Sequence, residues 1–149
     1  MFEMRQLRID EANSAAELHR KAGALIPGYD TTLHSQEEYQ AFYRHDVMEK
    51  GPVWGVFDQK TLRGHIALVP GWIDHLYVDP DFHRKGIGRY LVRAAQEEQD
   101  ELRLFTFQAN LGARSFYEHV GFVIEELTDG QRNEEKLPDV TYFWRRHSR

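Results

Sequence analysis

Hydrophobic and polar residues follow two different periods along the chain, and each change of period marks the end of a segment. Alternating or continuous apolar stretches, which are typical of β-strands, predict strands over residues 1–9, 52–57, 62–69, 72–78, 102–108, 122–127 and 140–144. Apolar residues three and four apart predict helices over 11–24, 36–49, 112–120 and from 87 to an acidic run at 96–101. The pattern therefore predicts a mixture of strands and helices.

Turn and capping residues mark where several of these segments begin and end. Asp10 is predicted to cap the first helix, and Ser35 with Glu38 forms a capping box before the second. Pro80 cannot donate a hydrogen bond to a sheet, so the strand before it should stop near residue 79. Gly121 is predicted to close the last helix in the left-handed conformation.

The order of the segments predicts how the strands pair. Short turns join the three strands between residues 52 and 78, which favours an antiparallel meander. A helix separates strand 72–78 from strand 102–108, so these two strands should be parallel neighbours. We expect one α/β (α+β) domain spanning 1–149, with a mixed, mostly antiparallel sheet of six or seven strands flanked by about four helices.

Composition narrows the class of protein. The chain has 149 residues, 41% of them hydrophobic and 13% aromatic, which is enough for a sizeable core. Its net charge of −5 argues against general nucleic-acid binding and weakly favours a cationic partner. No segment has the length of a membrane span, and the start of the chain has no signal-peptide core. We expect a cytoplasmic protein with neither nucleic-acid nor membrane partners.

The absence of cysteine and the spacing of the histidines and serines exclude several kinds of chemistry. The chain has no cysteine, so it has no disulfide, thiolate metal site or cysteine nucleophile. Its 8 histidines are scattered without a metal-binding spacing, and no metal site is expected. The elbow motif of serine hydrolases is absent.

The junction between strand 72–78 and the helix after it is a candidate anion site. The first N–H groups of a helix have no partner within the helix, and the helix dipole adds partial positive charge there. Gly86 and Gly88 allow a ligand to approach the backbone closely, and Arg84, Lys85 and Arg89 add cationic donors. This arrangement suits a phosphate or pyrophosphate. A tight turn with solvated charges is the alternative interpretation of the same spacing.

Two motifs in this half of the chain resemble those of the Gcn5-related N-acetyltransferases (GNAT family). The stretch from Val78 to Leu91 is similar to the family's acetyl-CoA signature, Gln/Arg-x-x-Gly-x-Gly/Ala, except that His83 stands at the first position. The second motif is Asn-x-x-Ala-x-x-Phe-Tyr-x-x-x-Gly-Phe, and it matches Asn110, Ala113, Phe116, Tyr117, Gly121 and Phe122. The resemblance is sharp over residues 73–122.

The resemblance implies an acetyl-CoA-dependent N-acetyltransferase. Such an enzyme transfers an acetyl group directly to a primary amine of a small molecule or peptide, in a ternary complex and without a metal. In the family, strand 72–78 and its parallel neighbour splay apart and the pantetheine arm of acetyl-CoA fills the gap. The implied cofactor contacts are Leu76, Tyr77, Val78, His83, Arg84, Lys85, Gly86, Ile87, Gly88, Arg89, Asn110, Ser115 and Tyr117.

The catalytic candidates follow from the chemistry of a thioester and an amine. Tyr117 occupies the motif position of a general acid that protonates or stabilises the leaving thiolate. Asp74 and His75 are candidates for the base that deprotonates the amine, and alternation predicts that they lie on opposite faces of the strand. All three also fit ordinary packing or sheet positions.

Several alternatives remain open at this point. Glu134, Glu135 and Asp139 are candidates for binding a cationic acceptor, or they form a charged surface loop. The chain could instead be a non-catalytic acyl-CoA-binding or interaction module, or could bind another nucleotide phosphate at the same loop. A sheet edge near the C-terminus could support a homodimer.

Overall fold

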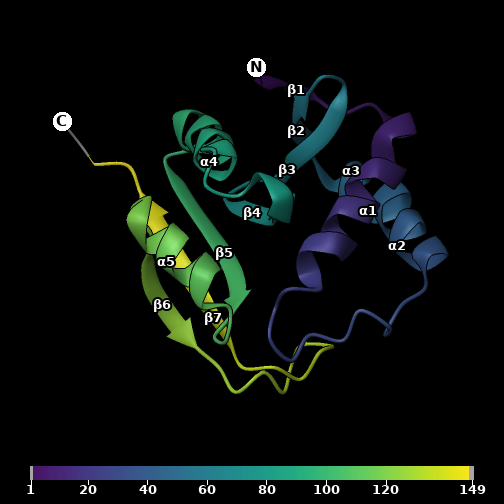
Figure 1. The fold of residues 1–149 in the computed structure, drawn as a ribbon. Coiled ribbons are helices and arrows are strands. Elements are labelled where there is room, and N and C mark those ends of the chain that lie inside the picture. Colours follow the sequence, from purple (N-terminus) through teal and green to yellow (C-terminus); the bar gives the residue numbers. More distant parts are fainter. Residues whose placement is uncertain (1, 148–149) are drawn as a thin grey trace.

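The described residues form one mixed sheet with helices on both of its faces. The computed structural model describes residues 2–147, so Met1 and the last two residues of the predicted domain lie outside the description. The sheet has seven strands in the order β1-β2-β3-β4-β5-β7-β6 (Figure 1). β4 and β5 are parallel and the other neighbours are antiparallel, as predicted.

All seven predicted strands are confirmed, although β1 ends earlier than the pattern predicts. The strands are β1 (Phe2–Gln6), β2 (Val53–Asp58), β3 (Thr61–Val69), β4 (Trp72–Val78), β5 (Glu101–Phe107), β6 (Val123–Leu127) and β7 (Asp139–Arg145).

The helices are confirmed in position, but several of their ends differ from the prediction by a residue or more. They are α1 (Ala12–Gly23), α2 (Gln36–Phe42), α3 (Met48–Lys50), α4 (Ile87–Glu98) and α5 (Leu111–His119), with 3-10 turns at Ile9–Glu11 and Pro80–Phe82. The prediction that Asp10 caps the first helix is wrong, because Asp10 lies within the first 3-10 turn and its carboxylate pairs with Arg8.

The second predicted helix is confirmed at its start and interrupted in its middle. Ser35 and Glu38 form the predicted capping box at the start of α2. A π-helical turn over Tyr43–Val47 then separates α2 from α3. This turn carries the side chain of Tyr43 into the interior, where it is fully buried.

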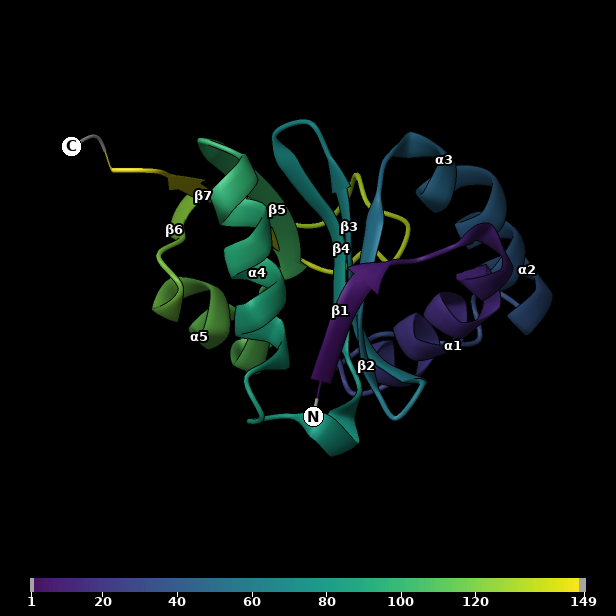
Figure 2. The same cartoon turned by 90° about the horizontal axis from the view of Figure 1, so that it is seen from above.

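Two separate cores lie on the two faces of the sheet. Figure 2 shows α4 and α5 on one side and α1 with α2 on the other. The first core joins α4 and α5 to the sheet and includes Ile87, Leu91, Tyr117 and Tyr142. The second core lies under α1 and α2. β4 therefore contributes side chains to two different environments, which decides what each of its residues can do.

Two irregularities in β4 define the centre of the molecule. β4 pairs with β5 at Trp72 and Arg103, and no further pair of the described strands continues that ladder. On its other edge, β4 pairs Ile73 with Leu68 and His75 with Ala67, so Asp74 is the extra residue of a β-bulge. The two parallel strands therefore separate beside a bulge, which leaves a seam between them.

Close packing of α4 on β3 depends on a glycine. A Cβ atom at Gly64 would lie 2.6 Å from Cγ2 of Ile87, which is buried at the start of α4. We expect Gly64→Ala to lower the free energy of unfolding by about 1–3 kcal/mol, the usual cost of overpacking a core.

Chemical denaturation measures this effect, and Gly112→Ala is the matched control. A Cβ atom at Gly112, in α5, meets no atom within 4 Å. The control should be neutral or slightly stabilising, because alanine favours a helix over glycine. Equal stability of the two variants would contradict the packing account.

Candidate active site

The start of α4 presents open backbone N–H groups to solvent. Gly86 is the N-cap residue with φ 83°, and no side chain caps the helix. A Cβ atom at Gly86 would meet nothing within 4 Å, so the space in front of this helix end is empty of protein. Arg84, Lys85 and Arg89 are exposed around it, and none of the three has an ion-pair partner within residues 2–147. This geometry suits an anion, and the predicted site stays a prediction.

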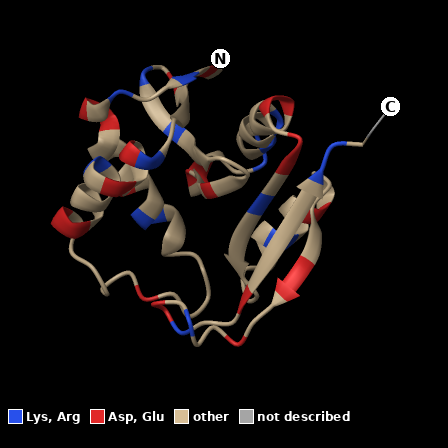
Figure 3. Cartoon of the chain, turned by 180° about the vertical axis from the view of Figure 1, so that it is seen from behind, with Lys and Arg blue, Asp and Glu red and all other residues tan. Residues whose placement is uncertain are grey.

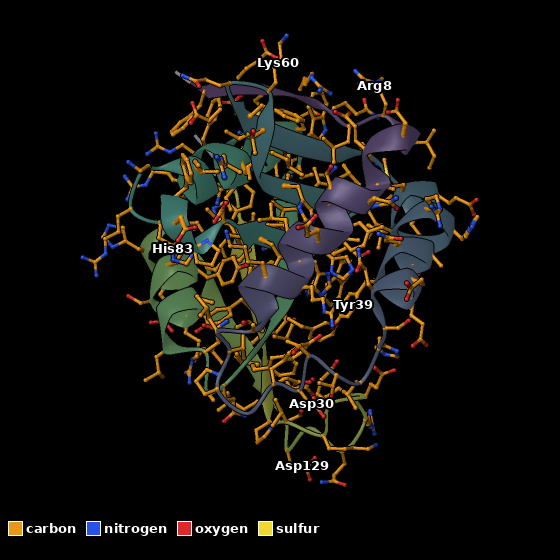
Figure 4. All side chains as sticks on the ribbon, turned by 45° about the vertical axis from the view of Figure 1, so that its right-hand side comes forward. Arg8, Asp30, Tyr39, Lys60, His83 and Asp129 are labelled. Carbon is orange, nitrogen blue, oxygen red and sulfur yellow. The ribbon has the colours of Figure 1, made fainter. Side chains whose placement is uncertain are left out.

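His83 helps to hold the loop in front of α4. Its side chain is exposed, and Nε2 donates a hydrogen bond to the backbone oxygen of Val78 at 3.3 Å (Figure 4). The imidazole thus links the loop to the end of β4. The substitution at the first position of the GNAT signature therefore has a structural role in this chain.

The two sequence motifs meet where α4 and α5 pack together. A Cβ atom at Gly88 would lie 3.1 Å from Cζ of Phe116, so the glycine lets α5 approach the first turn of α4. Ile87 is 2% exposed and belongs to the core. Gly88 has no side chain and that of Ile87 is buried. Only the backbone groups of these two predicted cofactor residues can therefore face a ligand at the helix end.

The side chains of β4 divide between the two faces of the sheet. Leu76 and Val78 pack against the core under α4 and α5. Tyr77 faces α1, and its ring stacks on that of His19 with centroids 4.1 Å apart. Cofactor contacts predicted at Leu76 and Val78 would therefore come from their backbone groups along the seam.

Tyr117 of α5 packs in the core that α4 and α5 form with the sheet. Its side chain is 7% exposed, and its hydroxyl has no hydrogen-bond partner among the described residues. Burial raises its pKa, so the phenol is protonated at neutral pH. Tyr117 in turn contributes, after burial, to the raised pKa of Tyr77 of β4.

Asn110 and Ser115 have weaker connections to the seam. The side-chain oxygen of Asn110 caps α5 by accepting from the N–H of Ala113 at 3.2 Å. That contact confirms a structural role for Asn110, and its predicted role toward a cofactor stays a prediction. Ser115 is exposed on α5, and its predicted role also stays a prediction.

Asp74 and His75 lie together, and the prediction that they occupy opposite faces is wrong. Simple alternation fails because Asp74 is the extra residue of the bulge. Its Oδ2 approaches Nε2 of His75 to 3.6 Å. Burial lowers the pKa of His75, and the charge of Asp74 opposes that effect. The bulge thus brings together a carboxylate and an imidazole that is neutral at neutral pH, on the side of the sheet that faces α1.

A buried hydrogen-bonded chain lies behind this pair, and sequence reasoning missed it. The hydroxyl of Tyr43 lies 2.8 Å from Nδ1 of His19 and 2.9 Å from Nε2 of His65. Burial lowers the pKa of both histidines. The pKa of His65 falls to about 3. The two histidines stand in apolar segments at a spacing that signals nothing by itself. Only the π-helical turn, which carries Tyr43 inward, brings them together.

Two loops meet at one end of the molecule, as Asp30 and Asp129 show (Figure 4). The side chain of His34, before α2, contacts Glu134, which lies between β6 and β7. A Cβ atom at Gly28 would lie 3.3 Å from Cδ2 of Leu137. These contacts join the loop that follows α1 to the loop that follows β6.

The three acidic candidates of the second loop have different surroundings. Glu134 contacts His34. Asp139 accepts hydrogen bonds from the Thr128 hydroxyl at 2.7 Å and from Nδ2 of Asn133 at 3.1 Å. Glu135 is half-buried and has no hydrogen-bond or ion-pair partner within the described part of the chain.

Residues 2–147 offer neither a metal-binding cluster nor a membrane-spanning helix. No three histidine, aspartate or glutamate side chains among them are placed to share a metal ion. None of their helices combines the length and apolar character needed to cross a membrane.

Comparison with known proteins identifies the family to which this fold and site belong. Residues 49–124 match the family model described as "Acetyltransferase (GNAT) domain". This match covers half of the chain, and the protein therefore belongs to the GNAT family.

Particular relatives agree with this assignment. The chain is 32% identical over 80 residues to "Peptidyl-lysine N-acetyltransferase YjaB" of Salmonella typhimurium, which is 53% of this chain and 55% of that protein. It is 29% identical over 102 residues to "Uncharacterized N-acetyltransferase YafP" of Escherichia coli, which is 68% of this chain and 64% of that protein. Both matches span less than two thirds of the relative's length.

Solved structures agree on the fold. The structure of the apo form of YjaB from Escherichia coli superposes with a TM-score of 0.79 at 21% identity, covering 97% of each chain. The PaiA N-acetyltransferase of Thermoplasma acidophilum, solved in complex with coenzyme A, gives a TM-score of 0.71 at 22% identity and covers 98% of this chain and 99% of that one.

The buried histidines predict how stability depends on pH. The pKa of His65 is about 3 in the folded chain and near 6.5 when unfolded. The unfolded state therefore binds more protons, and the free energy of unfolding should fall as pH falls from about 6.5. The slope is at most about 1.4 kcal/mol per pH unit for each such histidine.

Urea denaturation between pH 6.5 and 4.5 measures this slope. The window excludes the opposite contribution of His34, whose pKa is raised by Glu134 and whose stabilisation is complete below pH 6.5. His65→Gln should make the dependence shallower. A slope that stays the same in this variant would contradict the assignment of His65 as a buried neutral imidazole.

Proposed function

We propose that the protein is an acetyl-CoA-dependent N-acetyltransferase that transfers the acetyl group directly to a primary amine in a ternary complex. One observation carries the proposal. β4 and β5 separate beyond Trp72 and Arg103, the uncapped start of α4 follows β4, and the helix packed against α4 carries Tyr117, whose hydroxyl has no partner among the described residues.

The residues present fit acetyl-CoA. Its pyrophosphate matches the open N–H groups and exposed cations at the start of α4. An extended pantetheine arm matches the two facing strand edges, because their backbone N–H and C=O groups lack ladder partners along the seam. Acetyl-CoA supplies a thioester carbonyl that an amine can attack.

The chain's own residues would then handle two protons. As the amine nitrogen bonds to the carbonyl carbon and the carbon–sulfur bond breaks, the Tyr117 hydroxyl donates a hydrogen bond or a proton to the departing sulfur. Its raised pKa keeps the phenol protonated, so its hydroxyl is available to donate a hydrogen bond to the departing sulfur. A backbone N–H of β4 at the seam is the candidate donor to the carbonyl oxygen.

The Asp74–His75 pair is the candidate acceptor for the amine's proton. His75 is neutral because burial lowers its pKa, so its ring can accept a proton. Asp74 at 3.6 Å would stabilise the imidazolium that results. No cysteine is present to carry the acetyl group, which supports direct transfer.

The acceptor is an amine, and the names of two relatives suggest its class. YjaB of Salmonella typhimurium and YiaC of Escherichia coli are both named peptidyl-lysine N-acetyltransferases. We take the side-chain amine of a peptide lysine as the first acceptor to test. Binding of acetyl-CoA without release of free thiol across a panel of amines would instead favour a non-catalytic acyl-CoA-binding module.

Tyr117→Phe tests the general acid. The variant should lower kcat by about 100-fold, within the range that general acids contribute, while the Kd for acetyl-CoA stays within about twofold. Detection of released thiol measures the rate. Tyr90→Phe is the matched control, because Tyr90 is 49% exposed on α4. Equal turnover of the two variants would remove Tyr117 from the mechanism.

Gly86→Val tests the anion site at α4. Gly86 and Gly71 both have φ near 80° and open space around the Cβ position, so valine strains each backbone equally. Gly71 lies in the turn between β3 and β4 and serves as the control. Calorimetry should show acetyl-CoA binding weakened at least 10-fold in Gly86→Val and unchanged in Gly71→Val. The same Kd for both variants would refute the assignment.

A further inference from the structure

Glu135 lies between two points at which its loop is attached to the rest of the molecule. On one side, Glu134 contacts His34 of the loop before α2. On the other side, Leu137 packs at Gly28, the residue before Tyr29. The backbone of residue 135 is therefore held over the part of the first loop that carries Tyr29.

The first loop carries an aromatic cluster at this place. The hydroxyl of Tyr29 lies 3.2 Å from that of Tyr39, and its ring lies 5.9 Å from Phe107 at the end of β5. Burial is the main cause that raises the pKa of both Tyr29 and Tyr77, and the negative charge of Glu135 adds to it at each. The charge of Glu135 thus acts on both tyrosines, and the two attachments of its loop place it beside the first loop.

The carboxylate of Glu135 lacks the polar partners that the neighbouring carboxylates have. Glu134 is next to an imidazole, and Asp139 accepts two side-chain hydrogen bonds. The adjacent Lys136 turns away, because its ammonium donates to the backbone oxygen of Gln131 at 2.8 Å. Glu135 is half-buried and unpaired within residues 2–147. A carboxylate without a partner is available as the counter-ion of a cationic ligand.

We propose that Glu135 is the specificity-determining residue for the acceptor and that it binds the ammonium group of an alkylamine. The rings of Tyr29 and Tyr77 provide the faces against which the methylene groups and the positive charge of such an amine are stabilised. The inference rests on the proposed function, because it concerns the ammonium form in which the acceptor amine of that reaction binds. Asp74 and His75, on the same side of the sheet as Tyr77, then take the proton.

The arrangement of charge on the molecule agrees with this assignment. The back view shows acidic and basic segments together where the two loops meet (Figure 3), and the loops carry four acidic residues (Asp30, Asp129, Glu134 and Glu135) against two basic ones (Arg132 and Lys136). The open helix end that suits an anion lies instead at the start of α4. The excess of acidic residues at the loops and the exposed cations at the start of α4 thus lie in different parts of the molecule.

The experiment compares two ligands that differ by one charged group. Nα-acetyl-lysine amide carries the ammonium, and Nα-acetyl-norleucine amide keeps the methylene chain without it. Calorimetry on the full chain with CoA present gives the Kd of each. We expect the wild type to prefer the lysine amide, and Glu135→Gln to weaken that ligand about 10-fold or more, which is about 1.4 kcal/mol. The norleucine amide should bind both proteins equally.

Asp129→Asn is the matched control. It removes one negative charge from the same loop, and asparagine can still accept the hydrogen bond that the Gln131 N–H donates to Asp129 at 3.0 Å. The control should bind the lysine amide as the wild type does. An equal loss in Asp129→Asn would show a general effect of charge and overturn the assignment to Glu135.

The remaining outcomes separate this inference from the proposed function. An unchanged Kd for the lysine amide in Glu135→Gln, or no preference for it in the wild type, overturns the role of Glu135 even if the protein transfers acetyl groups. Preference for the lysine amide that depends on Glu135, in a protein that releases no thiol from acetyl-CoA with any amine, supports the acceptor site and overturns the proposed reaction.

Discussion

The structure depends on one interruption in a hydrogen-bonded ladder. β4 and β5 start as parallel neighbours at Trp72 and Arg103 and then separate. Backbone N–H and C=O groups inside a protein require partners, so two facing strand edges without a shared ladder form a site for an extended polar ligand. The bulge at Asp74 lies on the same strand. The irregular part of the sheet is thus the part that carries the proposed chemistry.

The rest of the fold holds this seam open from both sides. On one face, Gly88 lets Phe116 pack against the first turn of α4, which fixes the helix end relative to Tyr117. On the other face, Tyr43 links His19 to His65, and His19 supports the ring of Tyr77.

A buried carboxylate connects α1 to the loop that leads into α4. Asp79 is 3% exposed and is paired with Lys21 of α1 at 2.9 Å and with Arg63 of β3 at 3.0 Å. Its Oδ1 also accepts from the N–H of Asp81. These contacts fix the point where β4 ends, and the loop around Gly86 starts from there.

The sequence predicted the strands, the parallel neighbours and the start of α4 because local periodicity and glycine spacing encode them. It did not predict the face on which Asp74 lies, because one extra residue in β4 reverses the alternation and leaves no trace in composition. The His19–Tyr43–His65 chain depends on a π-helical turn, which a pattern of apolar residues does not distinguish from an ordinary helix. Glu135 lacks a partner among the described residues because the residues around it pair elsewhere. Those pairings are tertiary contacts, which the sequence does not show.

Thermal unfolding of the wild-type chain with separate additions of acetyl-CoA, CoA, ATP and NAD tests the central claim most directly. If the seam and the start of α4 form an acyl-CoA site, acetyl-CoA and CoA at about 100 times their Kd should each add about 2.7 kcal/mol to the free energy of unfolding. ATP and NAD should add much less. No shift with either CoA compound at millimolar concentration, or a larger shift with ATP or NAD, would contradict the account.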